Sequence, residues 1–361
     1  MSRVSCSAPA AGPPAPQLSV TDFRAELARL MAAHADRTVV VLALDGVNLT
    51  AAQACWPTAE TRLMRAAAPT TSSACWLSAL TGLDVADHGV PGVVFSAPGG
   101  ADGLVNFLDH HGPGLTPAEG NVFLDATALG RTPLAVLGDL EHYGSSWRDA
   151  LLAHARPVTG HRFYTAGGTY RRRPAAEVAD RVRTAVVETL ARRGTGQPCL
   201  LWCYVEVDQH VHRYGYDDHT VEVLTALGEF AASLATGDIV VVAHADHGLV
   251  PTVHDAALAN LLGDLGRRHG FAMGGAGRMR WLYPTRHDGP ELAALMGPVL
   301  PDGVRVLLAD EVFRPGSLAR ARVGEVLLVA EGKAFLTDPA YCYDHGSFAP
   351  EETDTPFSVW R

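Results

Sequence analysis

The chain has 361 residues, of which 47% are hydrophobic and 19% are charged. This balance supports a large buried core and excludes an intrinsically disordered chain. The net charge is −10 at pH 7 and no basic stripe with interleaved aromatic residues occurs, which argues against binding of a nucleic-acid duplex as the main activity.

The sequence gives little sign of a targeting or membrane segment. Residues 1–18 are rich in Ala, Pro and Ser without an apolar stretch, so they predict a flexible tail rather than a secretory signal. No apolar run approaches the roughly 18 residues that cross a membrane. The six cysteines include no C-x-x-C pair, which predicts buried free thiols in a reducing compartment. We therefore expect a cytoplasmic protein with no membrane segment.

Apolar runs alternate with stretches of helical spacing along the chain. An amphipathic helix over 22–35 is followed by strands over 39–44, 134–137, 199–207, 239–243 and 304–308, with helices over 72–81, 176–193, 219–235 and 290–299. This alternation predicts an α/β fold with a mainly parallel central sheet sandwiched by helices. We expect a single domain over 19–361. The segments 100–130 and 250–340, which are rich in Gly and Pro, should form loops and a small, loop-rich lobe that shape a pocket.

Acidic and imidazole side chains stand at strand ends or in loops: Asp45, Asp208, His212, Asp246, His247 and His345. Because ligands gather at the carboxyl ends of parallel strands, we expect these side chains to meet at one edge of the sheet. Asp208 and His212 are four residues apart, so a helical turn would place both on one face. Three Asp and three His are enough for two tetrahedral zinc sites, each with an open position. Manganese or iron would also suit such ligands.

Each of these pieces has an ordinary structural alternative when it is taken alone. Asp246 and His247, for example, can form a hydrogen-bonded pair in a loop that binds no metal. The combination favours a metal centre, because several pieces occur together and each lies at a strand end or in a loop.

A hydroxyl-rich turn over 69–73 leads into the helix predicted over 72–81, and Gly82 can cap the end of that helix. A hydroxyl at this place can be a simple N-cap. However, a helix N-terminus also favours anions such as a phosphoryl group, and a nearby metal ion would lower the pKa of a hydroxyl. The turn can therefore hold the nucleophile of a two-metal phosphoryl-transfer enzyme.

These residues resemble the alkaline phosphatase superfamily, specifically its nucleotide pyrophosphatase/phosphodiesterase (type I phosphodiesterase) branch. The similarity runs from about Val39 to Phe357. It rests on Leu44-Asp45-Gly46, on Pro69-Thr-Thr-Ser-Ser with Leu80-Thr81-Gly82 and His88-Gly89, on Tyr204-Val-Glu-Val-Asp208-x-x-x-His212-x-x-Gly215, on Ala245-Asp246-His247-Gly248, and on His345-Gly346-Ser347 with Pro350-Glu351-Glu352. The order and spacing of these motifs make the resemblance specific.

The resemblance implies an alkaline-phosphatase-like fold and two metal ions. One metal would be held by Asp208, His212 and His345, and the second by Asp45, Asp246 and His247. Ser72 stands at the family's nucleophile position, with Thr71 as the fallback. Ser72 would attack phosphorus in line and form a covalent phosphoryl-enzyme, which water then hydrolyses. The expected substrate is a small-molecule phosphate ester, a diester or nucleotide-type compound in preference to a monoester.

One position departs from the family pattern. Many nucleotide-cleaving members carry Asn in an H-G-x-x-G-N segment, whose amide holds a nonbridging oxygen, whereas this chain has Val93 there. The missing donor leaves phosphomonoesters, other diesters and phosphonates open as substrates.

Two other kinds of protein remain as alternatives. A phosphomutase or other phosphoryl transferase would use the same centre, but such enzymes usually need a large cap domain, for which the segment between the predicted helix over 72–81 and Asp208 is too short. A catalytically silent metal-binding relative would retain the fold alone. The sequence indicates neither the natural substrate nor the oligomeric state.

Overall fold

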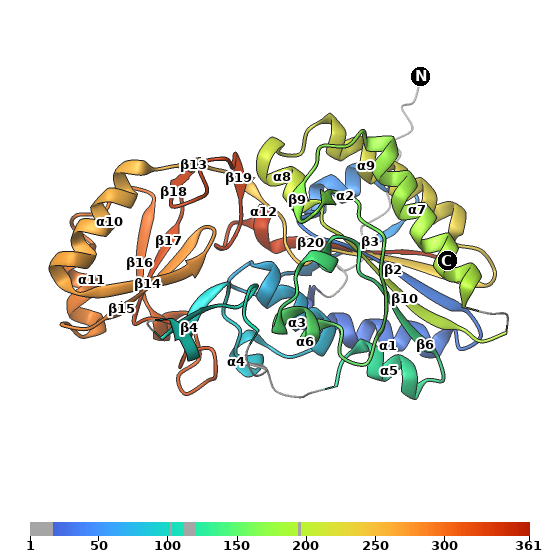
Figure 1. Ribbon diagram of the computed structural model, residues 1–361, viewed down its shortest axis with the longest axis horizontal. Coiled ribbons are helices and arrows are strands. Elements are labelled where there is room, and N and C mark those ends of the chain that lie inside the picture. The colour runs from blue at the N-terminus through green and yellow to red at the C-terminus, as the bar shows by residue number, and fades with distance from the viewer. Residues whose placement is uncertain (1–16, 102, 112–119, 194–195) are drawn as a thin grey trace, which may run out of the picture.

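Two sheets organise the chain in the computed structural model, which describes residues 17–101, 103–111, 120–193 and 196–361. A main lobe is built on an eight-stranded sheet and a second lobe on a six-stranded sheet (Figure 1). The main lobe contains both the first and the last described residues, and much of the second lobe is inserted between β11 and β20 of the main sheet.

The main sheet has the strand order β1-β3-β20-β11-β2-β10-β6-β7. These strands are β1 (Leu18–Ser19), β3 (Glu60–Arg65), β20 (Asp354–Trp360), β11 (Ile239–His244), β2 (Thr38–Leu44), β10 (Cys199–Val205), β6 (Thr132–Val136) and β7 (Arg156–Val158). Neighbouring strands run parallel, except that β20 is antiparallel to both β3 and β11. The mainly parallel sheet predicted from the sequence is therefore confirmed.

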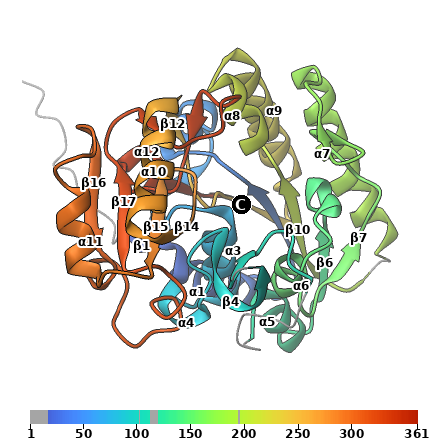
Figure 2. The same cartoon turned by 60° about the vertical axis from the view of Figure 1, so that its left-hand side comes forward.

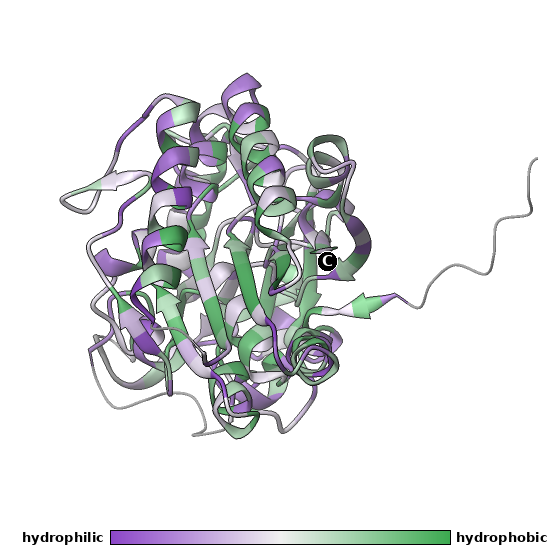
Figure 3. Cartoon of the chain, turned by 90° about the vertical axis from the view of Figure 1, so that its right-hand side faces the viewer, coloured by the Kyte–Doolittle hydropathy of each residue, from purple (hydrophilic) through white to green (hydrophobic). Residues whose placement is uncertain are grey.

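Helices cover both faces of the main sheet, as the alternating βα pattern requires. On one face lie α2 (Leu49–Cys55), α7 (Ala175–Arg192) and α9 (Asp218–Leu234), and on the other lie α1 (Phe23–Ala33), α3 (Ser72–Thr81), α5 (Val122–Ala128) and α6 (Ser146–Leu151). Figure 2 shows α7 and α9, which pack against each other. Alternate residues of β2 enter two different cores, and the strands are coloured mainly as hydrophobic in Figure 3.

The second lobe has more regular structure than the predicted loop-rich lobe. Its antiparallel sheet has the order β16 (Val304–Leu308), β17 (Val326–Ala330), β15 (Met279–Pro284), β14 (Phe271–Ala276), β4 (Val94–Ala101) and β5 (Leu104–Asn106). Two helices, α10 (Ala256–His269) and α11 (Gly289–Met296), pack leucine side chains against it. The segment predicted over 250–340 therefore folds around its own small core.

The remaining elements are short. They are α4 (Val85–His88), α8 (Asp208–Tyr214), α12 (Pro350–Thr353), β8 (Thr165–Ala166), β9 (Thr169–Tyr170), β12 (Val250–Pro251), β13 (Val253–His254), β18 (Ala334–Phe335), β19 (Tyr343–Asp344) and the 3-10 turns η1 (Val20–Asp22), η2 (Gly138–His142) and η3 (Ala309–Glu311). Among them, α8 and α12 carry residues that shape the site.

Two predictions are corrected by the structure. The strand over 304–308 exists, but it pairs with β17 in the second sheet rather than joining the main sheet. An apolar run favours a strand without specifying its partner, which explains the error. Residues 1–16 of the tail predicted over 1–18 lie outside the described residues. The prediction is wrong at Leu18, which is buried in β1 and pairs with Met64.

Within the described parts of the chain, no helix is both long and apolar enough to cross a membrane. Cys55, Cys75, Cys199 and Cys203 are buried free thiols, as predicted, whereas the free thiol of Cys342 is exposed. Cys6 lies outside the described residues.

Packing of α9 against the main sheet can be tested with two substitutions on one helix. Leu227 is 1% exposed in the core, whereas Val221 is 45% exposed. Leu227→Ala should lower the free energy of unfolding by about 2–5 kcal/mol, because it leaves a cavity. Val221→Ala should change it by less than about 0.5 kcal/mol. Urea denaturation followed by circular dichroism measures both, and equal losses would contradict this placement of α9.

Candidate active site

Three neighbouring strands of the main sheet, β11, β2 and β10, end at one place. Asp246, Asp45 and Asp208 follow their carboxyl ends. The backbone holds two of these residues together, because the Asp45 N–H donates to Val205 at 3.0 Å and the Asp208 N–H donates to the Asp45 carbonyl at 3.0 Å. The register of the sheet therefore brings the carboxylates side by side, as expected for an open α/β sheet.

The first ligand group consists of Asp45, Asp246 and His247, whose candidate ligand atoms lie within 4.8 Å of one another. His247 Nε2 is 3.2 Å from Asp246 Oδ2 and 3.7 Å from Asp45 Oδ1. All three side chains are buried. The fold therefore assembles one of the two predicted ligand sets.

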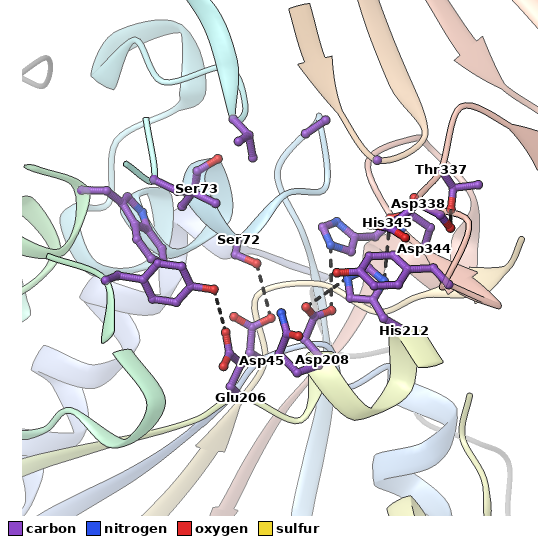
Figure 4. Close-up of a pocket in the computed structure, with 18 of the residues that line it drawn as sticks. Asp45, Ser72, Ser73, Glu206, Asp208, His212, Thr337, Asp338, Asp344 and His345 are labelled. Carbon is purple, nitrogen blue, oxygen red and sulfur yellow. Dashed lines mark hydrogen bonds and ion pairs between the residues drawn. The ribbon is translucent and has the colours of Figure 1, made fainter. Parts of the chain in front are cut away.

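The second predicted set, Asp208, His212 and His345, lies around Asp208 (Figure 4). Its members fall into two overlapping groups within 4.8 Å, one of Asp208, His247 and His345 and one of His212, Asp344 and His345. His212, one helical turn along α8, places Nε2 at 3.1 Å from Asp208 Oδ2, and His345 places Nε2 at 3.8 Å from Asp208 Oδ1. The ring of His345 also stacks on His247 with 3.8 Å between centroids, so the two groups adjoin each other. Asp344, which the sequence analysis did not single out, lies 3.9 Å from His212 Nδ1 and is a further carboxylate here.

All three histidines point the same nitrogen toward the carboxylates. Each Nδ1 lies against a backbone carbonyl: His212 against Tyr343 at 2.8 Å, His247 against Gly248 at 3.2 Å and His345 against Thr70 at 2.6 Å. A carbonyl only accepts hydrogen bonds, so Nδ1 is the donor and Nε2 is the nitrogen that faces the carboxylates. Histidines that bind metals are commonly oriented in this way.

The charge balance of the two groups also fits divalent cations. Asp208 Oδ1 and Asp246 Oδ2 are buried and accept no hydrogen bond, a costly arrangement without a compensating charge. Burial and the nearby Asp208 raise the pKa of Asp45 to about 7, and burial and Asp45 raise the pKa of Asp246 well above its usual range. Divalent cations would relieve this repulsion, and sets of Asp and His suit zinc.

Ser72, the first residue of α3, points toward Asp45 of the first ligand group (Figure 4). Its Oγ lies 3.1 Å from His247 Nε2 and 3.4 Å from Asp45 Oδ1. Thr71, the fallback, is buried, and its hydroxyl lies 3.2 Å from Ser73 Oγ. The geometry therefore favours Ser72 as the nucleophile.

Two aromatic residues donate hydrogen bonds to the carboxylate of Asp45. Trp76 Nε1 donates to Asp45 Oδ2 at 3.0 Å, and the Tyr204 hydroxyl donates to the same oxygen. Trp76 is four residues after Ser72, so one face of α3 presents the hydroxyl and also orients a ligand. That spacing was the available sequence signal for a supporting role of Trp76.

A cavity of about 290 Å³ opens above these groups, between the two lobes. The main lobe contributes Ser72, Ser73, Tyr143, Trp147, Glu206 and Gln209 beside the ligands, and the second lobe and its connections contribute Val93, Leu108, Ala276, Gly277, Arg280, Thr337, Asp338 and Tyr341. Val93, the departure from the family pattern, therefore lines the wall. Of the segments expected to shape the pocket, 100–130 provides Leu108 and 250–340 provides Arg280, while residues 112–119 lie outside the described part.

The comparisons with known proteins identify a matching family. The family described as type I phosphodiesterase/nucleotide pyrophosphatase matches residues 58–342. This range includes Ser72, Asp208, His212, Asp246 and His247, while Asp45 and His345 lie outside it. No protein in a search of curated sequences matches the chain.

Similar solved structures show the same fold. Phosphonoacetate hydrolase from Sinorhizobium meliloti 1021, in complex with phosphonoacetate, aligns with a TM-score of 0.65 and 21% identity over 90% of each chain. Murine ectonucleotide pyrophosphatase/phosphodiesterase 5 aligns with a TM-score of 0.61 and 14% identity, over 90% of this chain and 88% of that one. At these identities the likeness concerns the fold.

Removal of metal should destabilise the protein, because three buried carboxylates would lose their counter-charges. A cation that binds only the native state at 100 times its dissociation constant stabilises it by about 2.7 kcal/mol. We expect chelation to lower the thermal midpoint and zinc to restore it. In parallel, Asp246→Ala should reduce the zinc content measured by mass spectrometry, and Asp264→Ala, an exposed carboxylate on α10, should not. An unchanged midpoint after complete metal removal would contradict the metal centre.

Proposed function

This chain belongs to the type I phosphodiesterase/nucleotide pyrophosphatase family, and we propose that it hydrolyses small-molecule phosphate esters with Ser72 as the nucleophile. One observation carries the proposal: the Ser72 hydroxyl lies 3.1 Å from His247 Nε2, beside three overlapping groups of Asp and His whose candidate ligand atoms lie within 4.8 Å of one another. We propose a diester or nucleotide-type compound as the preferred substrate. A cytoplasmic location is proposed on the evidence of the free thiols.

Two zinc ions would be held by Asp208, His212 and His345 and by Asp45, Asp246 and His247, where they would stabilise developing negative charge and lower the pKa of a hydroxyl or water. Ser72 Oγ forms a bond to phosphorus while the bond to the leaving oxygen breaks on the opposite side. The Ser72 hydroxyl releases its proton as this bond forms, and the leaving oxygen takes up one proton and departs as an alcohol. Water then attacks the phosphorylated Ser72, which releases the phosphate product and restores the serine hydroxyl.

The position of Ser72 suits this role for a second reason. The residue begins a ten-residue helix, and the free N–H groups and dipole at a helix N-terminus favour an anionic phosphoryl group. Trp76 and Tyr204 hold Asp45 in place beside the hydroxyl. Nucleophile and ligand are therefore oriented together by α3.

A second candidate activity is phosphonate hydrolysis. Val93 gives the cavity wall an apolar side chain where many nucleotide-cleaving relatives carry an amide donor, and Arg280 places a guanidinium in the wall. Arg280 donates to the carbonyls of Gly277, Met279 and Leu336. Because these carbonyls are neutral, they do not cancel the charge of the guanidinium, which could bind a second anionic group on the substrate. The similar fold of a phosphonoacetate hydrolase supports the same candidate.

The nucleophile assignment can be tested with Ser72→Ala. We expect this variant to lose at least about 10³-fold in kcat for p-nitrophenyl phosphate esters while keeping its metal content, because no other hydroxyl occupies the same place. Thr71→Ala is the matched control and should stay within about tenfold of the wild type. Acid-quenched reactions should also give a phosphorylated Ser72 peptide by mass spectrometry. Full turnover by metal-loaded Ser72→Ala would overturn the assignment.

The same assays separate the other functions. A phosphomutase would release an isomer of its substrate instead of a hydrolysis product, and a silent relative would act on none of the mono- and diesters. For the second candidate, phosphonoacetate is the diagnostic substrate. We expect Arg280→Met to lower kcat/KM for phosphonoacetate about 10- to 100-fold, since a charge-assisted contact is lost, with hydrolysis of bis(p-nitrophenyl) phosphate nearly unchanged. No phosphonoacetate cleavage by the wild type would eliminate this candidate.

A further inference from the structure

Glu352, on α12, is a fully buried carboxylate whose two oxygens are each bonded twice. Oε1 accepts from Arg278 Nε at 2.7 Å and from the Ser347 hydroxyl at 2.9 Å. Oε2 accepts from the Thr70 hydroxyl at 2.9 Å and from the Ser347 N–H at 2.6 Å. These partners come from the turn before α3, from the loop after His345 and from the second lobe. The side chain therefore joins three segments that are distant in sequence.

Thr70 connects this carboxylate to the nucleophile and to a ligand. It lies two residues before Ser72, in the turn that leads into α3 through the N-cap residue Thr71. The Thr70 carbonyl accepts from His345 Nδ1 at 2.6 Å, and its hydroxyl accepts from the Gly346 N–H at 2.9 Å. Loss of the Thr70 hydroxyl would therefore loosen the turn and the orientation of the His345 ring together.

Arg278 connects the second lobe to Glu352 and His345. It lies in the turn between β14 and β15 and is buried, and its own N–H donates to the His345 carbonyl at 2.7 Å. The turn packs so closely that a Cβ atom on Gly277 would lie 1.9 Å from the same carbonyl oxygen. The second lobe therefore presses directly on the backbone of His345.

The backbone of Glu352 reaches the other ligand group. Its carbonyl accepts from the Gly248 N–H at 2.9 Å, immediately after His247. A Cβ atom on Gly248 would lie 2.2 Å from the Glu351 carbonyl, so α12 and this turn are in tight contact. Glu352 thus touches the segments that carry Ser72, His247 and His345.

We propose that Glu352 is a positioning residue. Together with Thr70 and Arg278, it fixes the positions of Ser72, His247 and His345 relative to one another. The proposal rests on the proposed function for the role of Ser72. A buried ion pair alone would be weak evidence for any stabilising effect. Here every lone-pair position of the carboxylate is used, and each bond leads to a segment that carries a site residue. Residues that orient metal ligands typically change metal affinity or activity about 10- to 100-fold when they are replaced.

Thr70 offers the sharpest test, because its hydroxyl can be removed with little change of shape. Thr70→Val should lower kcat about 10- to 100-fold with KM within about threefold of the wild type, and should weaken zinc affinity about tenfold or more in competition with a chelator. Thr70→Ser keeps the hydroxyl and should restore both values to within about threefold. The matched control is Thr355→Val, because the Thr355 hydroxyl is also buried and donates to Met64 on β3, in the main sheet. It should change neither value.

A double variant tests the link between the two side chains. Since Thr70→Val and Glu352→Gln weaken the same connection, their combined loss in zinc affinity should be clearly smaller than the product of the single losses. Independent, multiplicative effects would overturn the coupling. The proposal also fails if folded Thr70→Val keeps zinc affinity and kcat within threefold of the wild type, or if Thr355→Val weakens zinc equally. A wild type that cleaves no ester would refute the proposed function, whereas the zinc comparison would still decide the positioning role.

Discussion

Three carboxylates buried side by side at the end of one sheet are the constraint on which the rest of this structure depends. Asp45, Asp208 and Asp246 occupy the carboxyl ends of adjacent strands, and two of their oxygens accept no hydrogen bond. Such a cluster is unfavourable in a low-dielectric interior without positive charge nearby. Despite desolvation by burial, Asp208 raises the pKa of His212 to about 9, so this ring offsets one negative charge, and divalent cations would offset the rest. The surrounding structure is therefore best understood as a frame that keeps these groups in place for metal ions.

The two lobes contribute differently to that frame. The main sheet supplies most of the proposed ligands from rigid strand ends, and it presents Ser72 on a helix that also orients Asp45 through Trp76. The six-stranded sheet of the second lobe supplies none of the six proposed ligands, and His345 lies on the connection that leads from this lobe back to β20. Its turn at Arg278 instead supports His345 and Glu352, and its strand β15 places Arg280 in the cavity wall. The main lobe thus carries the proposed nucleophile and most of the proposed ligands. Both lobes position these groups and line the cavity that would hold the substrate.

The sequence predicts those parts of the site that are encoded locally. The ligands Asp45, Asp208 and Asp246 follow apolar runs, and such runs end at the same edge of a parallel sheet. The start of α3 at Ser72 was also predictable from the hydroxyl-rich turn before it. By contrast, Thr70 and Glu352 are 282 residues apart in the chain, and no local sequence pattern predicts a hydrogen bond between residues so far apart. Strand β3 was missed for a related reason: its residues Glu60, Arg62 and Arg65 are charged, and they become strand residues because β20 pairs beside them.

The same distinction explains why the reaction class is better determined than the substrate. Ligands and nucleophile must satisfy strict geometry, so they stand in a recognisable order along the chain, whereas the residues that contact the rest of a substrate need only line the cavity. Val93, Leu108, Arg280 and Tyr341 come from four separate segments, and none of them belongs to the proposed ligand sets. Tyr341 nevertheless stacks on the ring of His212, with 4.0 Å between centroids. Val93 shows the consequence, since it places an apolar side chain in the cavity wall where the family pattern led us to expect an amide, while all six expected ligands are present. Fold and metal ligands together therefore constrain the chemistry, and the identity of the cleaved group depends on the wall that the second lobe completes.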